Sequence, residues 1–124
     1  MTAQTLAAMG YAQSARLLRT TRGIEYDAFA RITRQLSDAL TAPASSIGKL
    51  AEAIHQNRLL WSALASDLVH PDNALPAALK GQLLSLSEFV RLHSSKVLNK
   101  QDSGEVLIDI NTAIMKGLRA EPGA

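Results

Sequence analysis

Histidine and carboxylate side chains are the groups in this sequence that could bind a metal ion or transfer protons. The 3 histidines are His55, His70 and His93, and no two of them are three or four residues apart. Helical metal sites use that spacing because it places two ligands on one face of the helix. We therefore expect no metal site, and we interpret His93 as a core histidine whose ring nitrogens are satisfied.

Asp67, His70 and Asp72 come close together in the sequence and could form an acid–base cluster. Pro71 lies among them, and proline at the second position of a turn ends a helix. Asp72 and Asn73 are residue types that stabilise turns through their own side chains. We favour a turn at this place over a catalytic site.

Other catalytic patterns are missing from the sequence. It contains no cysteine, its 7 glycines are scattered, and no glycine-rich phosphate loop or GxSxG nucleophile motif occurs. We therefore expect no enzyme activity and no cofactor, and we favour an interaction protein.

Three arginines, Arg16, Arg19 and Arg22, precede the first acidic residue, Glu25. A basic arm of this kind can attract RNA or an acidic protein surface. The net charge is only +2, whereas nucleic-acid-binding domains usually have a larger basic excess. A solvated helix face is the favoured interpretation of residues 1–22, which form either a weak N-terminal helix or a mobile arm.

Apolar residues recur at intervals of three and four, which predicts an all-α protein. Residues 23–120 are expected to form a bundle of four main helices, at about 24–40, 47–69, 76–98 and 102–120. Their core stripes are Phe29, Ile32, Leu36 and Leu40; Ile47, Leu50, Ile54, Trp61, Leu64 and Leu68; Leu79, Leu83, Leu86, Val90, His93 and Val97; and Leu107, Ile110, Ile114 and Leu118.

The residues at the ends of these segments agree with the assignment. Pro43 ends the first helix of the bundle, and the Ser45-Ser46 pair is expected to cap the next. Pro76 suits a first helical turn, and Asp102 with Glu105 has the spacing of a capping box.

Three polar or aromatic residues stand out within the apolar stripes. Asn57 projects into the stripe of its helix and Asn111 lies at the edge of another, so each amide needs a partner. The two asparagines could bond each other, a backbone carbonyl, or a bound peptide. Trp61, the single tryptophan, is expected to be a core anchor.

Size and hydropathy restrict the location and domain number. With 124 residues, 47% of them hydrophobic, the chain can bury one core without disulfides. No run approaches the roughly 20 apolar residues that span a bilayer, and the start lacks a signal-peptide pattern. We expect a cytoplasmic protein.

Five longer strings are informative together: Asn57-Arg58-Leu59-Leu60-Trp61, Asn73-Ala74-Leu75-Pro76, Leu86-Ser87-Glu88-Phe89-Val90, Ile108-Asp109-Ile110-Asn111 and Ile114-Met115-Lys116-Gly117-Leu118. In this order and at this spacing they resemble the FlaF family of flagellar biosynthesis regulators. The resemblance extends from about Tyr11 to Arg119, and the sequence departs from the family pattern at Arg22-Gly23-Ile24-Glu25.

The resemblance implies a regulator of flagellum assembly that promotes flagellin production or export. It also implies chaperone-like binding to flagellin and a functional pairing with an FlbT-type repressor of flagellin translation. An alternative is a post-transcriptional regulator that acts on flagellin mRNA or an FlbT-type partner through the three N-terminal arginines; a structural subunit of a flagellar complex is a third possibility. The candidate partner-binding residues are Asn57, Leu59, Leu60, Asn73, Leu75, Pro76, Phe89 and Asn111.

Overall fold

A computed structural model describes residues 26–43 and 46–119, with the side chains of the last two residues excluded. These residues form four α-helices and no strand: α2 (Tyr26–Thr41), α3 (Ile47–Leu68), α4 (Ala77–Leu98) and α5 (Glu105–Arg119). The all-α bundle expected from the periodicity is therefore confirmed. The predicted N-terminal helix or basic arm, residues 1–22, lies outside the described residues.

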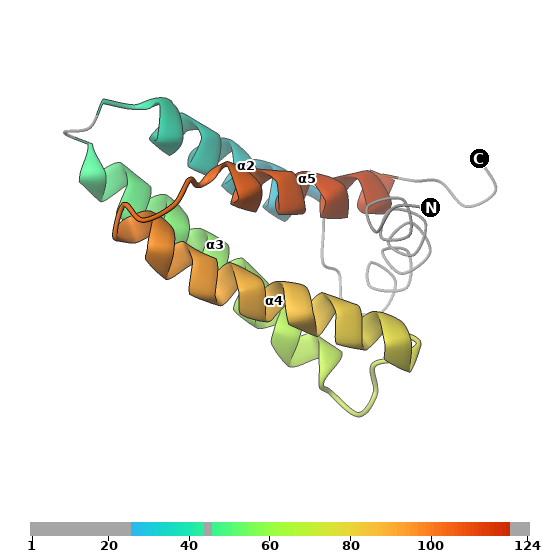
Figure 1. The fold of residues 1–124 in the computed structure, drawn as a ribbon. Helices are drawn as coiled ribbons and strands as arrows, with labels where there is room; N and C mark the ends of the chain where they lie inside the picture. The colour runs from blue at the N-terminus through green and yellow to red at the C-terminus, as the bar shows by residue number, and fades with distance from the viewer. Residues whose placement is uncertain (1–25, 44–45, 120–124) are drawn as a thin grey trace, which may run out of the picture.

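The four helices pack as two pairs. α2 lies beside α5, and α3 lies beside α4 (Figure 1). α2 also packs closely against α3, whereas α4 and α5 approach each other along only a short stretch. The short connections make successive helices antiparallel, as expected for neighbouring helices in a bundle.

The core largely follows the stripes that the periodicity predicted, although Leu40 is only half-buried. The side chain of Leu118, also predicted for the core, lies outside the described residues. Trp61 of α3 meets Phe29 of α2 edge-to-face, with ring centroids 6.0 Å apart. Ile47 differs from the expectation, because 48% of it is exposed. It is the first residue of α3, and the neighbouring helices do not cover that end. The largest buried apolar side chains are Trp61, Phe29, Leu36, Ile54, Leu64, Leu68, Leu83, Leu107 and Val90.

The structure confirms the position of one predicted helix cap and corrects the other; Ser45 lies outside the described residues. Ser46 is the N-cap residue of α3, but its side chain makes no capping hydrogen bond. Asp102 does not form a capping box, because α5 begins three residues later, at Glu105. The Asp102 carboxylate instead accepts a hydrogen bond from Ser103 N at 2.9 Å, and Ser103 Oγ accepts one from Glu105 N at 3.2 Å.

The connection between α4 and α5 comes close to the end of α2. A Cβ at Gly104 would lie 2.8 Å from Leu40 Cδ2, so only glycine fits this approach without movement of the leucine. In the described part of the chain, no helix is both long and apolar enough to cross a membrane.

Candidate functional site

A buried hydrogen-bond network centres on Asn111 of α5. Its Oδ1 accepts a hydrogen bond from Trp61 Nε1 at 2.9 Å. Its Nδ2 donates to Asn57 Oδ1 at 2.8 Å and to Thr33 Oγ1 at 3.1 Å. One amide thus joins α2, α3 and α5, and it satisfies both of its own donor hydrogens.

The network places Asn57 and Asn111 inside the protein. Both side chains are 0% exposed, so neither contributes to a partner-binding surface in this structure. Of the alternatives open for the two amides, the structure shows the bond between them. Nδ2 of Asn57 is buried and has no hydrogen-bond partner among the described residues. A buried donor left unpaired costs about 1–3 kcal/mol, which offsets part of the stabilisation from the other bonds.

Asn73 and Leu75 belong to the turn between α3 and α4. Asn73 Oδ1 accepts a hydrogen bond from Leu75 N at 3.0 Å, and Lys80 Nζ donates to Asn73 O at 2.6 Å. Both Asn73 and Leu75 are 6% exposed, so their side chains hold the turn rather than form an open surface. Pro76, the N-cap residue of α4, is exposed.

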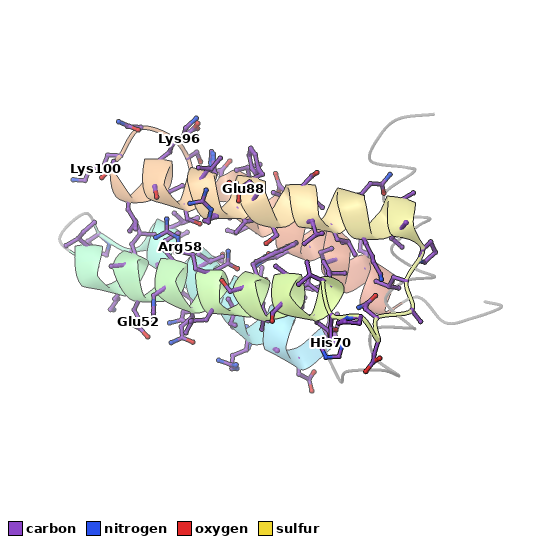
Figure 2. All side chains as sticks on the ribbon, turned by 90° about the horizontal axis from the view of Figure 1, so that it is seen from below. Glu52, Arg58, His70, Glu88, Lys96 and Lys100 are labelled. Carbon is purple, nitrogen blue, oxygen red and sulfur yellow. The ribbon has the colours of Figure 1, made fainter. Side chains whose placement is uncertain are left out.

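The same turn contains the histidine that could have suggested acid–base chemistry. His70 Nδ1 accepts a hydrogen bond from Asp72 N at 3.1 Å and lies 3.8 Å from an Asp72 carboxylate oxygen. The ring therefore shapes the turn, and Figure 2 shows it at the end of the bundle. Among the described residues, no group of three or more His, Cys, Asp or Glu side chains could hold a metal ion.

His93 is a core histidine with a hydrogen-bond partner on one ring nitrogen, Nε2. Its Nε2 lies 2.8 Å from Ser103 O, and its Nδ1 lies 3.9 Å from Asp102 Oδ2. Phe89 covers the ring in a stacked arrangement with centroids 5.1 Å apart. These contacts tie α4 to the connection that leads into α5.

The exposed apolar candidates lie on separate helix faces. Leu59 of α3 is 51% exposed and Phe89 of α4 is 42% exposed, whereas Leu60 is half-buried against the core. Ser87 and Arg91 face α3. Phe89 is two residues from each of them, or about 200° around the helix, so it lies on the far side of α4. The structure therefore does not bring Leu59 and Phe89 together.

A pocket of about 320 Å³ lies between α3 and α4, and we call it the α3–α4 pocket. Figure 2 views these helices side by side, with Arg58 between them and Glu88 on α4. The pocket is lined by Arg58, Trp61, Ser62 and Ala65 of α3 and by Ser87, Glu88, Val90 and Arg91 of α4.

Arg58 crosses from α3 to α4. Its Nη2 donates to Arg91 O at 3.1 Å and to Ser95 Oγ at 2.6 Å. The sequence patterns did not single out this residue as a site. One signal could have found it: Arg58 comes four residues after Ile54, at the edge of an apolar sector, where a long charged side chain lies along neighbouring apolar surface.

The second charged group of the pocket is an ion pair within α4. Arg91 Nε and Nη2 donate to the two carboxylate oxygens of Glu88, at 3.1 Å and 2.5 Å. These hydrogen bonds lower the pKa of Glu88 and raise the pKa of Arg91. Because this pair neutralises itself, Arg58 is the uncompensated charge of the pocket. The basic-arm residues Arg16, Arg19 and Arg22 lie outside the described residues.

The helices, the internal amide network and the surface pocket define a small helical-bundle protein, with a pocket large enough for one or two side chains. The model of the flagellar protein FlaF family matches residues 7–118. The chain therefore belongs to the FlaF family, and the resemblance noted in the sequence is confirmed. No curated protein and no solved structure matches the chain.

Proposed function

We propose that this protein binds flagellin in a chaperone-like manner in the cytoplasm and thereby promotes its production or export. Membership of a flagellar protein family supplies the biological context. The observation that carries the proposal is the exposure of large apolar side chains on neighbouring helices: Leu59 of α3 and Leu92 of α4 are each 51% exposed. A partner that spans both helices would cover these side chains and so gain apolar contact area.

The physical basis is helix-in-groove recognition. The terminal segments of flagellin are amphipathic and become ordered in the filament, so an unassembled monomer exposes apolar surface. A helical bundle can cover such a segment by receiving its apolar face between two helices. Folding of the segment on binding consumes part of the interaction energy, which keeps the complex reversible and suits transfer to export.

Calorimetric titration with purified flagellin tests this proposal. We expect saturable binding that Leu92→Ser weakens. The matched control is Ala51→Ser, which places the same side chain at an exposed position near the start of α3. Absence of a binding signal at tens of micromolar protein would contradict the proposed chaperone function.

The alternative is a post-transcriptional regulator that acts through flagellin mRNA or an FlbT-type protein. The three arginines Arg16, Arg19 and Arg22 support it, because they precede every acidic residue of the chain. RNA binding through them would weaken steeply with salt, whereas binding of an apolar helix would change little. Charge reversal of these arginines would abolish the RNA interaction and leave the apolar interaction intact.

A further inference from the structure

We propose that the α3–α4 pocket is an anchoring site for a carboxylate, which an acidic side chain on a helical segment of the partner places against Arg58. This inference rests on the proposed function, since it assigns a surface and a chemical preference to the same interaction. It adds a residue, Arg58, and a groove that the exposed leucines alone do not define.

Arg58 has unused hydrogen-bonding capacity. A guanidinium has five N–H donors in a planar fork that fits a carboxylate. In residues 26–43 and 46–119, the donor atom of its hydrogen bonds is Nη2, and the acceptors are neutral oxygens of Arg91 and Ser95. Nε is buried without a hydrogen-bond partner, and no ion pair joins Arg58 to a described carboxylate. Nη1 is therefore the nitrogen that remains for an incoming carboxylate, because Nη2 already donates two hydrogen bonds and Nε is buried.

The wall of the α3–α4 pocket is positively charged. Glu88 is the only acidic residue among the lining residues, and Arg91 binds both of its oxygens. The wall therefore has a net positive charge located at Arg58. Complementary charge on the partner would direct encounter and set the register of a docked helix.

The size of the pocket also fits a side chain. A pocket of about 320 Å³ lies at the lower end of the roughly 300–1,000 Å³ that small-molecule sites occupy, and this is room for one or two side chains. Trp61 and Val90 form apolar parts of the lining, whereas Ser62 and Ser87 offer hydroxyls. This mixture fits the aliphatic stem and charged end of a glutamate side chain.

An exposed apolar side chain, Leu92, lies on the same helix face as a pocket residue. Leu92 follows Glu88 by four residues, so the two share a face of α4. A partner helix whose acidic side chain enters the pocket can therefore place an apolar residue on Leu92. The pocket supplies the specific anchor and Leu92 adds apolar contact area.

The test uses the full chain, with Arg58→Gln to remove the charge and Arg34→Gln on the exposed face of α2 as the matched control. Two measurements are made: the affinity for purified flagellin by calorimetry, and the NMR signal of the Trp61 indole during titration with butyrate. Butyramide, which has the same shape without the charge, is the control probe. Circular dichroism checks that each variant is folded.

We expect Arg58→Gln to raise the Kd for flagellin by about tenfold or more, and Arg34→Gln to leave it within about twofold. Butyrate should shift the indole signal saturably in the wild type and not in Arg58→Gln, and butyramide should not shift it. If Arg58→Gln does not fold, Ser62→Asp replaces it. A carboxylate four residues after Arg58 can form an ion pair with the guanidinium, while Arg58 keeps its hydrogen bonds to α4. This variant should therefore show the same loss of flagellin affinity.

The outcomes separate the two proposals. Flagellin binding that is equally tight in wild type and Arg58→Gln overturns the anchoring site and leaves the proposed function in place. If the wild type does not bind flagellin but shows the charge-dependent butyrate response, the proposed function is overturned and the carboxylate site is supported. Absence of both responses overturns both.

Discussion

The indole of Trp61 donates a hydrogen bond to Oδ1 of Asn111 at 2.9 Å, across 50 positions of sequence and between two different helices. Both side chains are almost completely buried, at 2% and 0% exposure. The largest apolar side chain of the core thus has its one polar atom satisfied by an amide that also binds α2 and α3 residues. This arrangement makes the bundle register depend on a few polar atoms.

Asn111→Ala tests that dependence. The substitution removes the acceptor of the Trp61 indole and the donor to Asn57, and it leaves buried polar atoms without partners. We expect a loss of about 2–4 kcal/mol in the free energy of unfolding, measured by urea denaturation. Asp109→Asn, an exposed change two residues earlier on α5, should stay within about 0.5 kcal/mol. Equal stability of the two variants would show that the network contributes nothing.

Trp61→Phe separates the hydrogen bond from the packing of the ring. We expect it to cost less than Trp61→Ala, which should lose about 3–5 kcal/mol through cavity formation. A double-mutant cycle of Trp61→Phe with Asn111→Ala should give a coupling energy of about 0.5–3 kcal/mol, because the residues are in direct contact. Additive effects would contradict a bond between them in solution.

Gly104→Ala and Gly81→Ala should change stability in opposite directions. A methyl group at Gly104 would meet Leu40 Cδ2 at 2.8 Å, while one at Gly81 meets nothing within 4 Å. We expect Gly104→Ala to destabilise by about 1 kcal/mol, because the leucine must move out of its packing. Gly81→Ala, inside α4, should stabilise by about 0.5–1 kcal/mol.

Thermal unfolding of both glycine variants checks the comparison. Leu40→Ala, combined with Gly104→Ala, provides the control, since the smaller side chain should remove the penalty of the added methyl group. A penalty that persists in the double variant would place its cause elsewhere than in this contact.

The ion pair between Glu88 and Arg91 predicts a specific pH dependence. Because the hydrogen bond to Arg91 lowers the pKa of Glu88 below its ordinary value of 4.5, the folded state holds this carboxylate deprotonated more strongly than the unfolded chain does. The stabilisation is therefore present above about pH 4.5 and disappears as the pH falls through the folded pKa.

An NMR titration of the Glu88 carboxyl carbon measures this shift directly. Its pKa should rise when Arg91→Gln removes the donor, and high salt should weaken the effect because the pair is exposed. An unchanged pKa in Arg91→Gln would contradict the pairing. His55→Gln, a substitution outside the pair, should leave the Glu88 pKa unaltered.

The stripe of α4 shows how far helix periodicity could predict this fold. Leu83, Val90, His93 and Val97 are buried as the heptad spacing indicates, and Leu79 and Leu86 are half-buried. Periodicity predicts these correctly because it identifies the face of a helix that excludes water. It fails at Ile47, since burial at a helix end depends on how far the neighbouring helices extend.

The helix ends show a second limit. Asp102 and Glu105 have the spacing of a capping box, but the α4–α5 connection continues past Asp102 before α5 begins. The side chain of Asp102 has an alternative partner within this connection, Ser103 N, so the local pattern alone does not decide where the helix starts.

The buried amides and the pocket around Arg58 show what the sequence could predict and what only the packing of the helices decided. The order of residues was enough to predict that Asn57 and Asn111 need partners, since burial of an amide in an apolar stripe requires one. The packing of the helices alone decided that Asn111 bonds Asn57, 54 positions away, and Trp61, 50 positions away. The same holds for the α3–α4 pocket, whose lining comes from two helices. A helical repeat specifies which face is buried, but which other face it meets depends on the packing of the whole bundle.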